Sequence, residues 1–156
     1  LDDKYTYNNL DEYEQLEIIN RISPFHIKYM PDATDKVKLK AIKQDPNTIQ
    51  FVCKPSEYMI EQAVRAEYKC IKYIDNPSDK LQMFVVTHND DYIRYINNPS
   101  IEAQVYVVNK HKRNIYDIDK PCIEALIASG EIDHRFIINL SNTELEQLVL
   151  ALLWID

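Results

Sequence analysis

The sequence predicts an all-α protein, arranged as an α-solenoid of about six to seven 22-residue two-helix repeats. Isoleucines and prolines recur at this interval, which is typical of stacked units that cannot bury their apolar faces alone. The isoleucines are Ile27, Ile49, Ile71, Ile93, Ile115 and Ile137, and the prolines are Pro55, Pro77, Pro99 and Pro121. A single glycine in 156 residues disfavours tight hairpins, P-loops and dinucleotide-binding folds.

Seven units would account for 154 of the 156 residues, so we expect one helical-repeat domain over residues 1–156. Residues 1–22 match the pattern least well and are interpreted as a degenerate N-terminal cap. Residues 23–132 form the regular repeats, and residues 133–156 form a C-terminal repeat with an apolar last helix. Unit starts are expected near Leu1, Ser23, Asp45, Glu67, Asn89, His111 and Asp133.

Each unit begins with two apolar residues spaced i, i+3, which predicts a short helix with one buried face. The pairs are Ile27/Met30, Ile49/Val52, Ile71/Ile74, Ile93/Ile96, Ile115/Ile118 and Ile137/Leu140. Spacing does not decide whether this helix is α or 3₁₀.

A turn containing the recurring proline follows, and we expect each proline to begin a second helix. The residue before it is expected to be extended, and Asn76 with Asp79 suggests a loose capping box. Apolar residues four, eight and nine positions after the proline should form the buried stripe of this helix. They are Met59, Ala63 and Val64; Leu81, Val85 and Val86; Ala103, Val107 and Val108; and, by register, Val37, Ala41 and Ile42.

Several residues recur together in the central repeats: Asn76-Pro77-Ser78, Gln82, Val86, Asn89, Ile93-Arg94-Tyr95-Ile96 and Asn98-Pro99-Ser100. This block resembles the DUF4116 repeat family, whose members occur in bacteria, phages and large viruses and whose function is unknown. The resemblance covers about residues 27–128. It implies a short helical-repeat solenoid akin to HEAT-like arrays, and it implies no catalytic residue.

One column of the repeat is aromatic in four successive units, at Tyr29, Phe51, Tyr73 and Tyr95. With the neighbouring cations Lys72 and Arg94, these rings form a candidate groove for a peptide or for stacked bases. The alternative is that the rings cover the edge of the core, because columns of a repeat are usually structural.

Two basic clusters are candidate phosphate sites: Lys36, Lys40 and Lys43 on one helical face, and residues 110–113. Residues 23–132 carry 15 basic and 15 acidic side chains, so this region is neutral. Since a nucleic-acid-binding protein usually shows a basic stripe, we expect these lysines to be solvated helix ends.

The net charge of −7 resides at the two ends, with −4 in residues 1–22 and −3 in residues 133–156. Residues 148–155 are nevertheless apolar all round, and such a helix requires burial on every side. Leu148, Leu152 and Trp154 are therefore candidates for an interface with a partner or a second copy. Two alternatives would bury these apolar residues equally well: the helix folds back over the last unit, or the natural chain continues and covers it.

Catalysis and cofactors find little support in the sequence. The four histidines lie in different units, and Ser56, Ser78 and Ser100 are turn residues of the repeat. Neither a metal-ligand spacing nor a nucleophile with an adjacent base is visible, so no metal, no cofactor and no enzyme activity is expected. Three scattered cysteines and no apolar run of membrane-spanning length favour a cytoplasmic protein without a membrane partner.

The sequence therefore favours a non-enzymatic protein-binding module. The excess of Ile, Asn, Lys and Tyr is typical of an AT-rich genome such as that of a phage or large virus. In that setting the protein would be an inhibitor of a host factor or a virion component, located in the host cytoplasm or the virion. The alternative is a nucleic-acid-binding repeat protein that uses the aromatic column, and an enzyme is the remote option.

Overall fold

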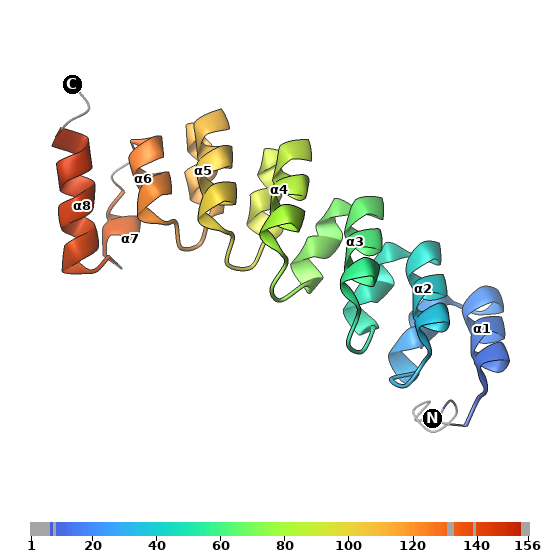
Figure 1. Ribbon diagram of the computed structural model, residues 1–156. Coiled ribbons are helices and arrows are strands. Elements are labelled where there is room, and N and C mark those ends of the chain that lie inside the picture. The colour runs from blue at the N-terminus through green and yellow to red at the C-terminus, as the bar shows by residue number, and fades with distance from the viewer. Residues whose placement is uncertain (1–6, 8, 131–132, 139, 154–156) are drawn as a thin grey trace. The chain divides into compact units, whose positions relative to one another are not determined.

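A computed structural model describes residues 7, 9–130, 133–138 and 140–153 (Figure 1). Over these ranges the regular structure is entirely helical, with α and 3₁₀ helices and no strand, which confirms the all-α class. No described helix has the length and apolar character needed to cross a bilayer. The chain divides into two compact units, Leu1–Ile74 and Asp75–Asp156, called here the N-terminal and C-terminal units.

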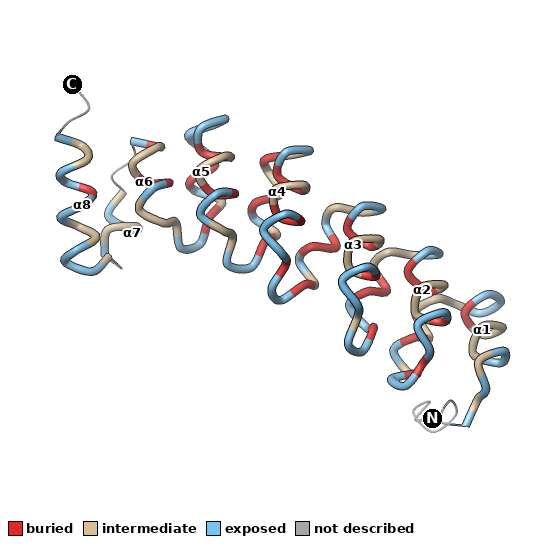
Figure 2. Tube along the Cα trace, viewed as in Figure 1, coloured by how far each residue is buried: buried red, intermediate tan, exposed pale blue. Residues whose placement is uncertain are grey.

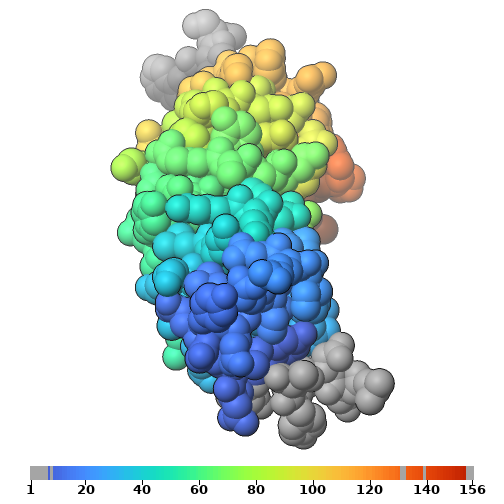
Figure 3. Space-filling model, turned by 90° about the vertical axis from the view of Figure 1, so that its right-hand side faces the viewer, coloured from blue at the N-terminus to red at the C-terminus, as the bar shows by residue number. Residues whose placement is uncertain are grey.

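The N-terminal unit contains two rows of helices. One row comprises α1 (Glu12–Arg21), α2 (Asp35–Gln44) and α3 (Glu57–Ala66), in which α2 contacts both neighbours. The other comprises the 3₁₀ helices η2 (Pro24–Tyr29), η3 (Pro46–Phe51) and η4 (Tyr68–Tyr73), which also contact one another in order. The blue, cyan and green surfaces of this unit accordingly adjoin in chain order in Figure 3.

The C-terminal unit starts in the same way, with α4 (Asp79–His88), η5 (Asp90–Tyr95), α5 (Ile101–Lys110), η6 (Lys112–Asp117) and α6 (Ile123–Ser129). Two further helices follow, α7 (His134–Ile137) and α8 (Asn142–Leu153). Helix α5 packs between α4 and α6, α8 packs on α6, and η5 contacts η6.

The 22-residue period appears directly in the helix boundaries. Helices α2 to α6 begin at residues 35, 57, 79, 101 and 123, and η2 to η6 begin at residues 24, 46, 68, 90 and 112. The first helix of each regular unit is therefore a six-residue 3₁₀ helix. Its N-cap is the residue that starts the unit: the side chains of Ser23, Asp45, Glu67 and Asn89 each accept a hydrogen bond from the backbone N–H two residues later.

The prediction that each recurring proline begins the second helix is wrong. Helices α3 to α6 begin two residues after the proline, and their N-caps are Ser56, Ser78, Ser100 and Cys122. Because Ser78 holds the N-cap, the capping box between Asn76 and Asp79 does not form. Serine suits the N-cap because its side-chain oxygen can accept a hydrogen bond from a backbone N–H of the first turn. Ser56 and Ser100 accept such bonds from the N–H groups of Met59 and Ala103.

The expected extended conformation before the proline is also absent at two positions. Lys54 and Asn98 have φ angles of 50° and 52°, in the left-handed region that turns use to reverse direction. Asparagine tolerates this region, whereas lysine is strained there. Proline at the first helical position does occur, but in η2 and η3, at Pro24 and Pro46.

The predicted core is confirmed from residue 27 to residue 118. Figure 2 shows the buried stripes, and the buried side chains include every apolar pair of the first helices up to Ile118. The three stripe positions of α2, α3, α4 and α5 are also buried. In the last unit, Ile137 and Leu140 are only half-buried.

The last unit keeps its apolar residues in register but not its helices. Helix α6 ends at the only glycine, Gly130, whose φ of 68° suits a left-handed C-cap. Helix α7 is a four-residue α helix instead of a six-residue 3₁₀ helix, and α8 begins three residues before the position that the period gives. Ser141 and Glu144 set this earlier start, because each accepts a hydrogen bond from the backbone N–H of the other.

Candidate functional site

The aromatic column occupies the last residue of each 3₁₀ helix from η2 to η5. Tyr29, Phe51 and Tyr73 belong to the N-terminal unit, together with Lys72, while Tyr95 and Arg94 belong to the C-terminal unit. Phe51 is 39% exposed and the three tyrosines are half-buried. The predicted groove residues are thus divided between two units, and each set is described within its own unit.

In the N-terminal unit, the rings contact groups of their own unit. Tyr7 stacks on Tyr29 with a centroid distance of 5.7 Å, and Phe25 meets Phe51 edge-on at 6.1 Å. The Lys72 ammonium lies over the Tyr73 ring, 4.7 Å from its centroid. These contacts are those expected of rings that cover a core edge, and the groove stays a prediction.

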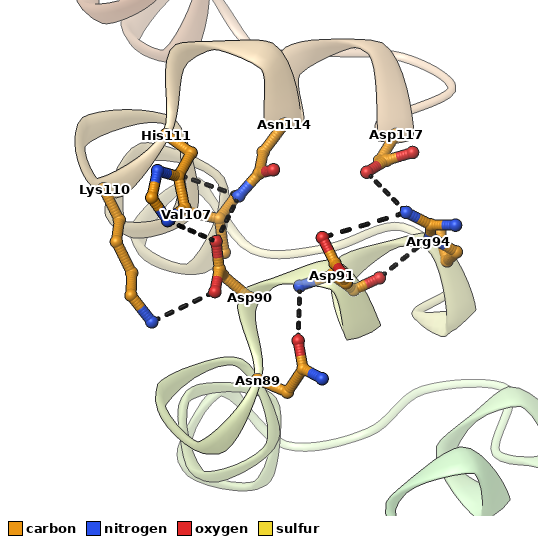
Figure 4. Close-up of polar contacts among 9 residues, drawn as sticks. All are labelled: Asn89, Asp90, Asp91, Arg94, Val107, Lys110, His111, Asn114 and Asp117. Carbon is orange, nitrogen blue, oxygen red and sulfur yellow. Dashed lines mark hydrogen bonds and ion pairs between the residues drawn. The ribbon is translucent and has the colours of Figure 1, made fainter.

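Arg94 is engaged by two aspartates of the C-terminal unit. Its Nη2 lies 3.0 Å from the Asp117 carboxylate and 3.9 Å from that of Asp91, and its Nε donates to the Asp91 carbonyl (Figure 4). Asp117 occupies the aromatic column one unit later, so the guanidinium links η5 to η6.

A polar cluster around Asp90 joins the same two 3₁₀ helices. The Asp90 carboxylate accepts hydrogen bonds from Lys110 Nζ at 3.0 Å and from Asn114 Nδ2 at 2.7 Å, and His111 Nε2 lies 3.8 Å away (Figure 4). Burial alone would raise the pKa of Asp90, but the hydrogen bonds from Asn114 and Lys110 outweigh it and lower the pKa. Asp90 is therefore held as an anion.

Asn114 is fully buried in this cluster and also donates to the Val107 carbonyl at 3.1 Å. Its Oδ1 accepts no hydrogen bond from the described residues. The same column holds Thr48 and Cys70, which are likewise buried, but also His26 and Tyr92, which are half-buried. Because the residues of this column differ in size and polarity, the sequence contains no clear signal for the cluster.

Two glutamines bind the turns of the C-terminal unit together. Gln82 donates to the Pro77 carbonyl at 2.9 Å and accepts from the Ser100 N–H at 2.7 Å. Gln104, 22 residues later, donates to the Pro99 carbonyl and accepts from the Cys122 N–H, both at 2.7 Å. Both glutamines are nearly fully buried, so the glutamine of the recurring sequence block has a structural role.

A cleft of about 700 Å³ lies beside Gln104 in the C-terminal unit. Its wall is formed by three successive turns, at residues 75–76, 97–99 and 119–120, and by the ends of η5 and η6. The lining residues are Asp75, Asn76, Ile93, Arg94, Ile96, Asn97, Asn98, Pro99, Gln104, Asp117, Ile118, Asp119 and Lys120. Of the residues predicted for the groove, the cleft contains Arg94.

The N-terminal unit has a hollow of about 550 Å³ between α1 and α2, where the three lysines noted in the sequence converge. It is lined by Leu16, Asn20, Lys36, Leu39, Lys40 and Lys43. Lys36 pairs with Glu12 at 2.8 Å, and the hydrogen bonds from Lys36 and Thr34 lower the pKa of Glu12. One of the three cations is therefore already neutralised.

Helix α8 exposes an apolar stripe at the end of the C-terminal unit. Leu148 is buried at 3% exposure and Leu152 is half-buried, while Trp154, the third predicted interface residue, lies outside the described residues. Val149, Leu150 and Leu153 are 54%, 58% and 69% exposed. Ile138, in the turn that precedes α8, is 75% exposed. The exposed stripe therefore lies next to the predicted one on the helix.

Among the described residues, no group of three or more His, Cys, Asp or Glu side chains is placed to hold a metal ion. Within that part of the chain all three cysteines are free thiols, with Cys53 exposed and Cys70 buried. A hydrogen bond of 3.0 Å joins the His26 ring to the Tyr7 hydroxyl, and the His88 ring lies 2.7 Å from the Phe84 carbonyl.

The sequence and structure were compared with models of known protein families, with curated proteins and with solved structures. None of these three comparisons gave a match.

Proposed function

We propose that this chain is an α-solenoid that acts as a non-enzymatic protein-binding module in the cytoplasm. The observation that carries the proposal is the apolar stripe of α8, formed by Val149, Leu150 and Leu153. The free cysteines support a reducing compartment. We also propose that the chain is related to the DUF4116 repeats and that it originates from a phage or a large virus.

The stripe differs from ordinary surface leucines. Single exposed apolar residues are common, but Val149 and Leu153 lie one turn apart and Leu150 lies between them, so they form a continuous patch. Helix α8 also packs on α6, and its Leu148 is buried. The stripe is thus a second apolar face that neighbours within the unit leave open.

Burial energetics indicate what kind of partner suffices. Covering three aliphatic side chains that are slightly more than half exposed contributes about 3–5 kcal/mol, whereas association costs at least about 4 kcal/mol. The α8 stripe alone therefore gives weak binding, and a stable complex needs a second contact. A partner helix that extends past α8, or a second copy of the chain, provides it.

The nucleic-acid alternative receives less support. Lys72 lies over its neighbouring ring and Arg94 is paired with Asp117, so two cations of the proposed base-stacking surface already have partners. Binding of nucleic acid depends on cations free to replace counterions.

The experiment compares the parent chain with the double variant Leu150→Glu/Leu153→Glu. Self-association is followed by light scattering over a concentration series, and binding of other proteins by affinity capture from the source cell. We expect both interactions to be lost in the double variant. The control Ile101→Glu alters another exposed apolar residue, 55% exposed on α5, and should leave them unchanged.

Two results would contradict the proposal. One is that the double variant, with an unchanged circular dichroism spectrum, retains all partners. The other is that the parent binds oligonucleotides with an affinity that falls steeply with salt.

A further inference from the structure

We infer that the cleft of the C-terminal unit binds an extended peptide segment that carries a lysine or arginine side chain. This inference rests on the proposed protein-binding function and names the class of partner, but it uses a surface separate from the α8 stripe. The cleft volume of about 700 Å³ lies within the range typical of ligand sites.

The cleft follows three turns that recur at the sequence period, and each turn contributes two adjacent polar side chains. They are Asp75 and Asn76, Asn97 and Asn98, and Asp119 and Lys120. Helices in contact lie about 10 Å apart, so three successive turns extend over roughly 20 Å. An extended chain rises about 3.3 Å per residue, so about six residues match this length.

The two positions of each turn differ in hydrogen-bonding chemistry. The first position holds a carboxylate, an amide and a carboxylate, all of which offer acceptor oxygens. The second holds two amides and an ammonium, all of which offer donor N–H groups. An extended backbone presents alternating N–H and C=O groups along its edge, whereas a helix uses these groups internally. The cleft therefore suits an extended ligand.

These six side chains are exposed and make no hydrogen bond or ion pair through their side chains with the residues that the structure describes. The other polar residues of the lining differ, because Arg94 is paired with Asp117 and Gln104 with the Cys122 backbone. The six turn side chains are thus the part of the cleft whose hydrogen-bonding groups remain available for a ligand.

Charge specifies one side chain of the ligand. Asp119 is adjacent to Lys120 along the chain, whereas Asp75 is adjacent to the neutral Asn76. With Asp117 neutralised by Arg94, the unbalanced charge is negative and lies at the Asp75 end. The charged end of a lysine or arginine side chain can meet Asp75 in this cleft.

The test pans a phage-displayed library of random octapeptides against the full chain, and then measures selected labelled peptides by fluorescence anisotropy. We expect enrichment of sequences with lysine or arginine. Asp75→Asn should raise the Kd of these peptides three- to tenfold, and Asp75→Lys should shift the selection to peptides with Asp or Glu.

A second variant tests recognition of the backbone. Asn97→Ala combined with Asn98→Gly removes two amide side chains, and glycine keeps the φ of 52° at position 98 accessible. It should raise the Kd of every selected peptide about tenfold, whatever its charge. The control Asp79→Asn changes an exposed aspartate of α4 outside the cleft and should leave all Kd values unchanged.

Three results would overturn the inference. The library yields no peptide above background, the selected peptides bind the Asp75 and Asn97/Asn98 variants as tightly as the parent, or their binding is lost in Leu150→Glu/Leu153→Glu. In the last case the peptides bind α8. Conversely, peptides that require Asp75 and tolerate the α8 variant establish the cleft even if the α8 stripe proves to bind nothing.

Discussion

The side chain of Gln104 accepts a hydrogen bond from the backbone N–H of Cys122 at 2.7 Å, and so ties one turn of the C-terminal unit to the N-cap of the next helix. Its amide nitrogen donates to the Pro99 carbonyl at the same time. Gln82 makes the corresponding pair of bonds one period earlier. A single residue type thus satisfies two backbone groups that would otherwise lack partners within the unit.

Replacing Gln104 with alanine should lower the free energy of unfolding by about 2 kcal/mol, because two backbone groups beside a buried side chain lose their partners. The measurement is urea denaturation followed by circular dichroism. Gln147→Ala, at an exposed position on α8, is the matched control and should change stability by less than about 0.5 kcal/mol. Equal effects of the two substitutions would mean that the Gln104 bonds contribute nothing.

Lys54→Asn should stabilise the N-terminal unit by about 0.5–1 kcal/mol. Lys54 has a φ of 50°, which a lysine adopts at a cost and an asparagine adopts readily. Lys120→Asn alters the same column where φ is not positive, so it should give no such gain. Thermal unfolding of both variants checks this, and a gain at position 120 as large as that at position 54 would exclude the backbone explanation.

Asp90 should make stability depend on acid pH. Its pKa is lowered from the ordinary 3.8, so its stabilising contribution is fully present above that value and is lost as the pH falls through the lowered pKa. We expect Asp90→Asn to be less stable than the parent by about 1–2 kcal/mol at pH 7, and this difference to shrink as the pH falls below 3.8. Melting temperatures across this range provide the measurement.

The control for this prediction is Asp119→Asn, an exposed aspartate without a hydrogen bond or ion pair to the described residues. It measures the effect of removing an exposed carboxylate that makes no such contact. A stability difference for Asp90→Asn that is the same at every pH would show that its carboxylate gains nothing from Lys110 and Asn114.

The cysteines should differ widely in reactivity. Burial raises the pKa of Cys70 from 9.0 to about 12, which reduces its thiolate population about 1000-fold. Cys53 is exposed, so iodoacetamide should modify it at least 100-fold faster than Cys70 in the folded protein. Mass spectrometry of peptides after timed labelling measures both rates. In denaturant the two should converge, and rapid labelling of folded Cys70 would contradict its burial.

Much of the fold could be predicted from the sequence, because its period fixes the buried positions and the interval between successive helix starts. The isoleucines from Ile27 to Ile115 were placed correctly since a recurring apolar pair leaves one choice of inner face. The helix starts were misplaced by two residues because proline was preferred over Ser56 and Ser100 as the boundary. Ser56 and Ser100 accept a backbone N–H at this boundary, whereas Ser78 and Cys122 hold the same N-cap position without a side-chain hydrogen bond.

The candidate sites were less accessible to sequence reasoning. The cleft beside Asp75 depends on where three turns lie in space, and the Asp90–Asn114 bond joins residues 24 apart, which no single repeat contains. The aromatic column was visible because it repeats, and repetition favours residues with structural roles. Positions that break the pattern, such as Asp117 and Asn114, carry the polar contacts instead.

The forward direction of the glutamine bonds has a consequence for how such a chain can change over generations. Gln82 and Gln104 each reach into the segment that follows, so a segment carrying this glutamine needs a successor whose turn supplies a backbone N–H. Lys38 and Ile60 stand at the same position in the N-terminal unit and impose no such requirement. Duplication or deletion of a segment therefore has different effects at different places in the chain. A segment that carries the glutamine must keep a suitable segment after it.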